Sequence, residues 1–252
     1  MYENIRNIVP LLRGLNYWTF KQRIKDSLRN VSTIQLLYRI DVYKATELKR
    51  EEFLRIKNTD EQIAFLKTNC ELHRTTKVRK AHSFVLNFLC ALEVAIAGPY
   101  DDVSDGVTLT DTSNTPFVCT YVYLWSNSTF YSVFGAEAVT GDTSYGIVAG
   151  IGTTAPTNTD YCIETIILDG DTSGKFLYQS CSVGAANVVG TNVDMFISRC
   201  VVNNSGGTIT IREIGQINKG IAKYVMITHD AVNQDVDNGE IAVLQYIWRT
   251  TV

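Results

Sequence analysis

Histidine is scarce in this sequence, and its scarcity excludes several kinds of catalytic site. The three histidines are His73, His82 and His229. The first two are nine residues apart in a segment that we expect to be helical, so they face opposite sides and cannot share a metal ion. Asp230 follows His229, but no Gly-x-Ser-x-Gly elbow supplies a nucleophile for a triad. We therefore predict a protein that is not an enzyme and has no metal centre or cofactor.

Paired cysteines and long apolar runs are also missing. The six cysteines include no Cys-x-x-Cys pair, which favours reduced thiols over a disulfide scaffold. The most apolar stretch, residues 84–97, is too short to cross a bilayer at 1.5 Å per residue. Residues 1–10 lack the basic start and apolar run of a signal peptide. These absences predict a chain without a membrane span or a secretory signal.

Two glycine-rich stretches depart from the nucleotide-binding motifs that they resemble. Residues 170–175 (GDTSGK) have three residues between their glycines instead of four, and Phe176 stands where Ser or Thr must bind magnesium. Gly146, Gly150 and Gly152 lack dinucleotide-binding spacing. No helix is predicted after either stretch. We interpret the first as a hairpin turn and the second as glycines that permit strand bends or close backbone approach.

The residues that are present divide the chain near Gly98. Residues 1–98 hold 17 of the 23 Lys and Arg but 10 of the 26 Asp and Glu, whereas residues 99–252 hold the other 6 and 16. The first part is therefore basic and the second acidic, which suggests different neighbours for the two parts. The alternative is that solvated helices simply carry more Lys and Arg than β loops.

Helix is the predicted structure of the basic part, which has one proline and two glycines. We expect helices over about 15–30, 32–57 and 60–97, the last ended by Gly98 and Pro99. A helix over 60–97 would be about 55 Å long, a length typical of extended or oligomeric structures. A break near Thr75 and Thr76 would remove this argument.

The acidic part has the pattern of an all-β domain. Turn clusters separate β-branched and aromatic runs, which predict strands at residues 106–111, 117–125, 144–149, 161–168, 175–183, 192–202, 207–214, 223–228 and 240–249. In the last run both faces are apolar, which predicts a central strand or a strand that a partner covers. The predicted fold class is α+β in segregated segments, with N-terminal helices (1–98, a docking or oligomerisation segment) followed by an all-β sandwich (99–252), jelly-roll-like or Ig-like.

One basic cluster is a candidate docking patch. It consists of Arg74, Lys77, Arg79 and Lys80 on the predicted third helix. The patch could contact an acidic protein surface or nucleic-acid phosphates. Because no nucleic-acid-binding signature surrounds it, a solvated helix face is the preferred alternative.

Acidic clusters provide the remaining candidate chemistry. Two of them offer oxygen ligands for calcium: Asp101, Asp102 and Asp105, and Asp235, Asp237 and Glu240. Neither matches the twelve-residue calcium loop, so we interpret both as solvated turns. A carboxylate pair acting on cell-wall polysaccharide stays open as a third function, without a positive feature in its favour.

A series of turn and loop positions characterises residues 144–252. They are Gly150, Gly152, Thr154, Ala155, Pro156, Thr157, Asp160, Arg199, Asn203, Asn204, Ser205, Gly206, Glu213, Gly215, Asp230, Asp237 and Gly239. In type and order they resemble a C-terminal β-domain of tailed-bacteriophage structural proteins, from which Gln216 departs because Leu is usual there. The chemistry of these residues predicts structural roles: the glycines permit tight turns, Pro156 stiffens a loop, and Glu213 and Arg199 could pair between strands.

Together the division, the charges and the resemblance predict an accessory structural protein of a phage particle. We expect a homo-oligomer in the head, neck or tail, located in the virion after synthesis in the host cytoplasm. Its expected partners are copies of itself and other virion proteins, with no membrane. The alternative is a receptor- or glycan-binding fibre or adhesin module, in which aromatic side chains stack on sugars. The candidates for that stacking are Tyr121, Tyr123, Trp125, Tyr131 and Phe134.

Overall fold

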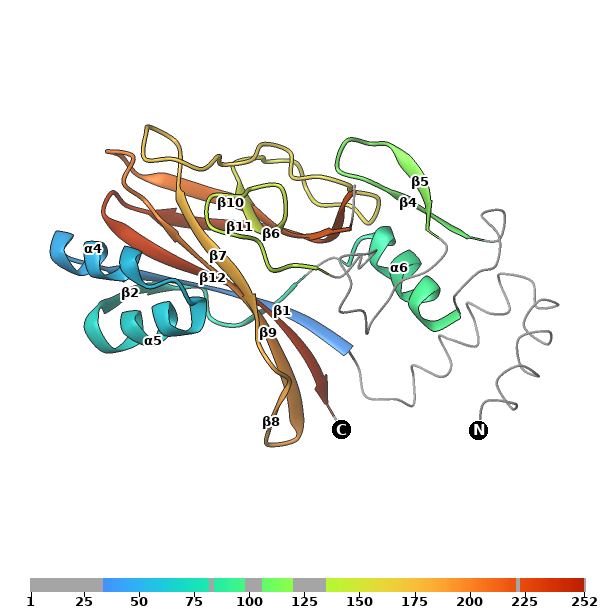
Figure 1. Cartoon of the computed structure of the whole chain (residues 1–252), viewed down its shortest axis with the longest axis horizontal. Helices are drawn as coiled ribbons and strands as arrows, with labels where there is room; N and C mark the ends of the chain where they lie inside the picture. Colours follow the sequence, from blue (N-terminus) through green and yellow to red (C-terminus); the bar gives the residue numbers. More distant parts are fainter. Residues whose placement is uncertain (1–33, 82–83, 98–105, 120–134, 221–222, 252) are drawn as a thin grey trace.

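The computed structural model describes residues 34–81, 84–97, 106–119, 135–220 and 223–251 (Figure 1). In this part of the chain, antiparallel strands predominate over three helices. The helices are α4 (Glu47–Arg55), α5 (Thr59–Asn69) and α6 (Leu86–Ala97). The strands are β1 (Ile34–Lys44), β2 (Glu71–Thr75), β3 (Arg79–Lys80), β4 (Val107–Thr110), β5 (Pro116–Cys119), β6 (Gly146–Gly150), β7 (Leu177–Val183), β8 (Asn187–Val189), β9 (Asn192–Val202), β10 (Ile209–Lys219), β11 (Tyr224–Val236) and β12 (Glu240–Thr251).

Strand β12 lies at the centre of the largest sheet. This sheet has the order β2-β1-β12-β9-β7, with β3 also paired to β1 and β8 to β9. A second sheet has the order β11-β10-β6, and β4 pairs with β5. In β12, Leu244 and Tyr246 face the core between the two sheets, whereas Ile241 and Val243 face the helical side. The prediction of a central final strand with two apolar faces is confirmed.

Three apolar clusters hold the layers together. The first fills the space between the two sheets and includes Ile40 of β1 and Ile214 of β10. In the second, Phe88 of α6 packs with β4, β5 and β11. In the third, Phe53 of α4 and Leu66 of α5 pack on the other face of the main sheet. The main sheet is thus covered on both faces along much of its length, which explains why β12 and β9 are rich in buried residues on both sides.

The predicted fold class is wrong, because the described chain does not begin with helices that precede a separate β-sandwich. Where a helix was predicted over 32–57, residues 34–44 form β1, which pairs with β12 from Ile34↔Thr250 to Lys44↔Glu240. Leu36, Tyr38 and Val42 recur at even positions and enter the core between the sheets. This period of two is the strand pattern, and pairing with β12 satisfies the backbone of β1.

The predicted helix over 60–97 is also wrong, since it is divided into α5, β2, β3 and α6. The break falls at the residues on which the length argument depended: Thr75 ends β2, and Thr76 donates its N–H to the carbonyl of Ile40. The Thr76 hydroxyl in turn accepts from the N–H of Ile40 at 2.8 Å. Neither α5 nor α6 approaches the length of about 55 Å that suggested an oligomer.

Other boundaries follow the sequence more closely. β9 occupies the predicted 192–202, whereas the predicted strand at 161–168 is an irregular segment with one isolated bridge between Gly150 and Ile166. The predicted helix over 15–30 and the domain boundary near Gly98 lie outside the described residues. The main sheet draws β1 from before that boundary and β12 from after it.

Candidate functional site

His229 of β11 bridges two carboxylates beneath the loop 151–165. Its Nδ1 lies 2.6 Å from Oδ2 of Asp160 in the loop, and its Nε2 lies 2.9 Å from Oε2 of Glu213 on β10. Glu213 also accepts backbone N–H donors from the loop, among them that of Gly152 at 2.8 Å and that of Thr165 at 3.0 Å. The ring of His229 and the carboxylate of Glu213 are almost fully buried. This cluster fastens the loop to the three-stranded sheet.

The electrostatics of the cluster favour its charged form. Burial opposes ionisation of His229, but hydrogen bonds to Glu213 and Asp160 outweigh burial and raise the pKa of the imidazole. Burial likewise opposes ionisation of Glu213, and hydrogen bonds from His229 and the loop backbone outweigh it, so the pKa of Glu213 is lowered. The pKa of Asp160 is lowered because hydrogen bonds from Thr157 and His229 outweigh burial. His229, Glu213 and Asp160 therefore form a network of ion pairs between the loop and the sheet.

Two glycines of the loop motif make room for Glu213. A Cβ at either Gly150 or Gly152 would fall on Oε1 of Glu213, well inside van der Waals contact. Pro156 lies in the same loop, half-buried. These positions match the expectation of close backbone approach. Gly215 is also crowded, since a Cβ there would lie 2.9 Å from Cδ1 of Ile163 and 3.0 Å from the carbonyl of Thr228.

Asn203 joins the two turns at the other end of the molecule. Its buried amide donates to the carbonyls of Gly207 (2.8 Å) and Val236 (2.7 Å), and its backbone carbonyl accepts from Gly239. Gly206 donates its N–H to the side chain of Asn238. Most residues predicted from the motif thus form two groups in space. One group surrounds Glu213 and holds the loop 151–165, and the other surrounds Asn203 and holds the two turns. Asp230 belongs to neither group and accepts a hydrogen bond from the hydroxyl of Tyr246 at 2.9 Å.

Arg199 and Glu213 do not form the predicted ion pair. Arg199 is fully buried on β9, and its guanidinium donates to five backbone carbonyls. The acceptors are Gln179, Tyr145, Ile147, Val139 and Asp142. The guanidinium carbon also lies 4.6 Å from the ring centroid of Tyr178. The five carbonyls together satisfy the donors of the guanidinium, so Arg199 ties the 139–147 segment to the main sheet.

A second polar cluster lies where β2 meets the β11–β12 turn. His73, Asp237 and Glu240 bring their ligand atoms within 4.8 Å of one another, which is close enough to hold a metal ion. The guanidinium of Arg74, however, already bonds to both carboxylates. Thr208 donates to the other oxygen of Asp237 at 2.8 Å. Because Arg74 supplies the positive charge that a metal would bring, we interpret this cluster as an ion-pair network.

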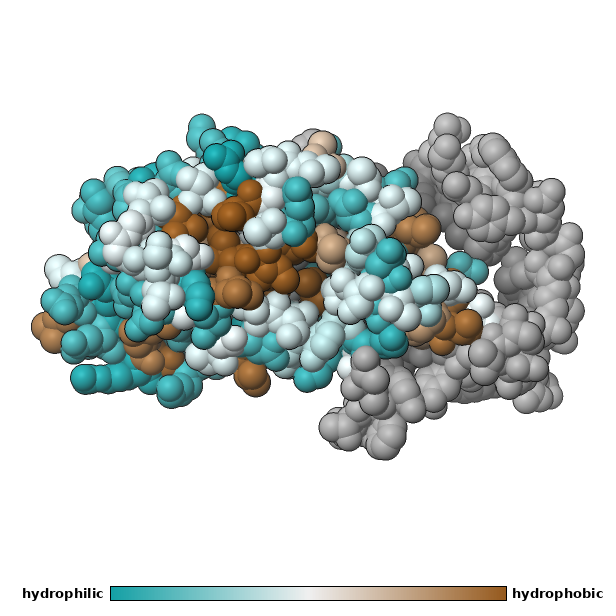
Figure 2. Space-filling view, turned by 90° about the horizontal axis from the view of Figure 1, so that it is seen from above, coloured by the Kyte–Doolittle hydropathy of each residue, from teal (hydrophilic) through white to brown (hydrophobic). Residues whose placement is uncertain are grey.

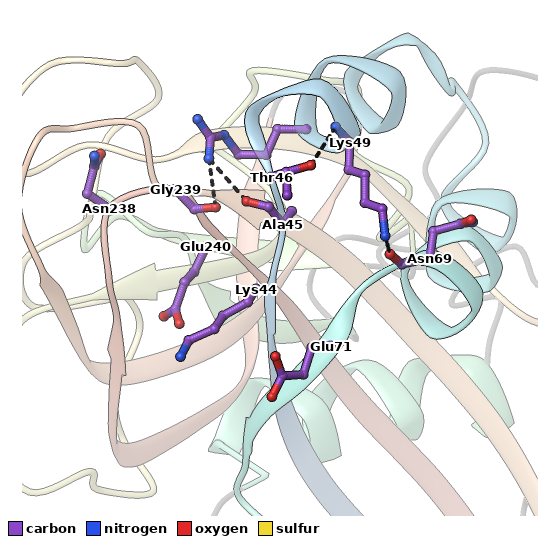
Figure 3. A pocket seen from close by; sticks show the side chains of 10 residues that line it. Lys44, Ala45, Thr46, Lys49, Asn69, Glu71, Asn238, Gly239 and Glu240 are labelled. Carbon is purple, nitrogen blue, oxygen red and sulfur yellow. Dashed lines mark hydrogen bonds between the residues drawn. The ribbon is translucent and has the colours of Figure 1, made fainter.

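An open hollow lies next to this cluster (Figure 3). It has a volume of about 470 Å³, within the range of small-molecule sites. Its walls come from the end of β1, the start of α4, the end of α5 and the β11–β12 turn, and its lining residues are Lys44, Ala45, Thr46, Lys49, Arg50, Asn69, Glu71, Asn238, Gly239 and Glu240. Thr46 forms the N-cap of α4 by accepting from the N–H of Lys49. The side chains that line the hollow are mostly charged or hydrogen-bonding groups.

The predicted basic patch is a strand edge and not a helix face. Arg74 lies on β2 and is neutralised by Asp237 and Glu240. Lys77 occupies the turn with a φ of 37°, and Arg79 and Lys80 form β3. These last three side chains are exposed at the edge of the main sheet, where β3 pairs with β1.

Sequence reasoning missed the residues that converge through long-range pairing. His73 and Glu240 are 167 positions apart, and His229 and Asp160 are 69 apart. Neither pairing has a local sequence signal. The acidic cluster near residue 101 and the aromatic candidates of residues 121–134 lie outside the described residues.

Comparisons with protein-family models, curated proteins and solved structures find no match to this chain. In the part of the chain that the structure describes, no helix is long and apolar enough to span a bilayer. The class that the fold itself defines is a β-rich protein, whose described residues form three antiparallel sheets and three helices.

Proposed function

We propose that this chain is a non-catalytic structural protein that assembles with copies of itself, as an accessory component of a phage particle in the virion. The observation that carries the proposal is an unprotected strand edge at β8. Support for the phage context comes from the turn and loop positions of residues 144–252. Other virion proteins are the further partners that this role requires.

Strand β8 is the outer edge of the main sheet at one end. It pairs only with β9 among the described strands, and the β8–β9 hairpin projects away from the rest of the molecule (Figure 1). Val188 is 77% exposed and Val189 is 54% exposed. The backbone edge of β8 that faces away from β9 therefore has no strand partner in the described chain. Two exposed apolar side chains lie on the same strand.

The sequence around β8 lacks the usual protection against pairing. Residues 184–193 contain no charged residue and no proline. Exposed edges in soluble proteins are normally blocked by charge, by proline or by a covering segment, because an open edge recruits further strands. An apolar, uncharged edge on a projecting hairpin is the arrangement expected of a strand that is paired in an assembly.

A second apolar surface supports the same interpretation. Figure 2 shows an apolar patch in the middle of the face viewed from above, bordered by polar residues. The segment between β6 and β7, which runs along this side, exposes Ile151 (48%) and Leu168 (54%). Contiguous apolar patches on soluble proteins commonly mark interaction sites.

The test is the oligomeric state of the full chain, measured by size-exclusion chromatography with light scattering. We expect an oligomer for the wild type and a smaller species for the double variant Val188→Lys, Val189→Lys, because two charges block an edge. Leu48→Lys is the matched control, since Leu48 is 67% exposed on α4. A monomeric wild type, or an oligomer unaffected by the double variant, contradicts the β8 assignment.

The virion assignment is tested separately by mass spectrometry of purified phage particles. Peptides of this chain are expected at a constant ratio to the major structural proteins. A chain that is absent from particles and monomeric in solution overturns the proposal as a whole.

A further inference from the structure

We propose that the hollow between α4 and the β11–β12 turn binds an acidic saccharide, with its cations on the acidic group and its amides on the hydroxyls. This inference concerns a different surface from β8 and does not rest on the proposed assembly. It is carried by the charges that line the hollow, the partners that those charges have, and the side chains that the lining lacks.

The cations of the lining are held by neutral acceptors. Nζ of Lys49 donates to the carbonyl of Asn69, and Nη1 of Arg50 lies 3.3 Å from the carbonyls of both Ala45 and Gly239. A carbonyl orients a cation without cancelling its charge. Figure 3 shows the Lys49 side chain extended toward Asn69. Lys44 has no hydrogen bond or ion pair within the described residues, so its ammonium group is available.

The carboxylates of the lining leave that positive character in place. Glu240 is engaged by Arg74 and by Nδ1 of His73 at 2.5 Å. Glu71 is exposed on β2, across the strand pair from Lys44. The lining thus has three cations against two carboxylates, and one of the two is already neutralised from outside the hollow. An anionic group is favoured in this setting.

The remaining lining residues indicate what accompanies the anionic group. Asn69, Asn238 and Thr46 offer amide and hydroxyl groups, which are suited to bonding sugar hydroxyls. The lining has no aromatic residue and Ala45 is its only apolar one. A ligand with a nucleobase or another aromatic ring would find no aromatic side chain to stack on in this hollow. A ligand that is polar throughout and carries an acid fits it best.

Gly239 keeps the hollow open beside Arg50. Its φ of +86° is left-handed, and a Cβ at this position would lie 2.6 Å from Nη1 of Arg50. A side chain here would therefore displace the guanidinium from the rim. The glycine serves both the turn and the position of the cation.

The experiment compares glucuronic acid with glucose, which differ at one carbon in having a carboxylate in place of a hydroxymethyl group. Binding to the full chain is followed by NMR chemical-shift titration at low ionic strength. We expect glucuronic acid to bind at least tenfold more tightly than glucose, and binding to weaken as salt is added. Shifted amides are expected in residues 44–50 and 238–240.

Two variants distinguish binding in the hollow from nonspecific electrostatic attraction to the protein surface. Lys44→Gln should weaken glucuronic acid binding about tenfold, because it removes one charge-assisted hydrogen bond. Lys67→Gln is the control, since Lys67 is exposed on α5 and does not line the hollow. Equal binding of glucose, equal binding of inorganic sulfate or phosphate, or no effect of Lys44→Gln would overturn the proposal. Thermal unfolding of each variant verifies that it is folded.

Discussion

Nε2 of His229 lies 2.9 Å from Oε2 of Glu213, and this contact places a titrating pair under the loop 151–165. The other ring nitrogen bonds to Asp160, so one imidazole joins a loop residue to a strand residue. The attachment of the loop to the sheet therefore depends on the protonation states of His229, Glu213 and Asp160. Stability of this region is expected to vary with pH on both sides of a maximum.

The first prediction is the pH profile itself. The folded-state pKa of His229 is raised above about 6.5, so its contribution is complete below that pH and is lost as pH rises through the folded value. The folded-state pKa values of Glu213 and Asp160 are lowered, so their contribution is present above about pH 4.5 and is lost as pH falls. Urea unfolding from pH 3 to 9 should show greatest stability between about pH 4.5 and 6.5.

The second prediction concerns His229→Gln. Removing the imidazolium leaves two carboxylates without their shared cation, at a cost of about 3 kcal/mol in the free energy of unfolding near pH 6. The decline in stability above pH 6.5 should also become smaller than in the wild type. His73→Gln is the control, with an expected cost of about 1 kcal/mol or less because Arg74 still neutralises Glu240. Equal losses in the two variants would argue against the bridge.

The third prediction concerns Gly152→Ala. The added Cβ would overlap the carboxylate of Glu213. We therefore expect the free energy of unfolding to fall by about 2 kcal/mol and residues 153–161 to be cleaved faster by proteases. Gly207→Ala is a matched control, because a Cβ there meets nothing within 4 Å. Unchanged proteolysis of the loop in Gly152→Ala would show that the close approach is dispensable.

The fourth prediction concerns Arg199→Lys. An ammonium group has three donors and cannot span the five carbonyls that the guanidinium joins, so unfolding should become easier by about 3 kcal/mol. Arg212→Lys, at an exposed position on β10, should change stability by less than about 0.5 kcal/mol. Both changes in the free energy of unfolding are measured by denaturant titration at one pH. A loss below about 1 kcal/mol for Arg199→Lys would contradict the role assigned to the guanidinium.

The strands after residue 99 could be predicted largely from alternation and turn residues, and β9 has the predicted bounds. β1 could not, because Leu36 and Leu37 are both buried and the apolar pattern is compatible with a buried helix or a two-faced strand. Pairing with β12, far along the chain, decides between them. In residues 34–44, long-range strand pairing thus overrides the local preference for helix.

The polar clusters were partly visible in the sequence. Glu213 and Asp160 both belong to the turn and loop pattern. The predicted ionic partner of Glu213 was Arg199, whereas the structure pairs both carboxylates with His229. A neighbouring His and Asp in sequence suggested only a weak triad, and the effective partners come from other elements. The hollow near Lys44 could not be foreseen, since three stretches that are separate in the sequence (44–50, 69–71 and 238–240) form its walls.

The pairing of β1 with β12 has a consequence for biosynthesis. Lys44 leaves the ribosome long before Glu240, its opposite residue, so β1 spends most of translation without the neighbour that completes the sheet. Contacts between such distant segments make folding slow and leave adhesive strands accessible in the meantime. Production of the protein is therefore expected to depend on chaperone supply and low growth temperature, with nascent chains that stall before residue 240 being prone to aggregate.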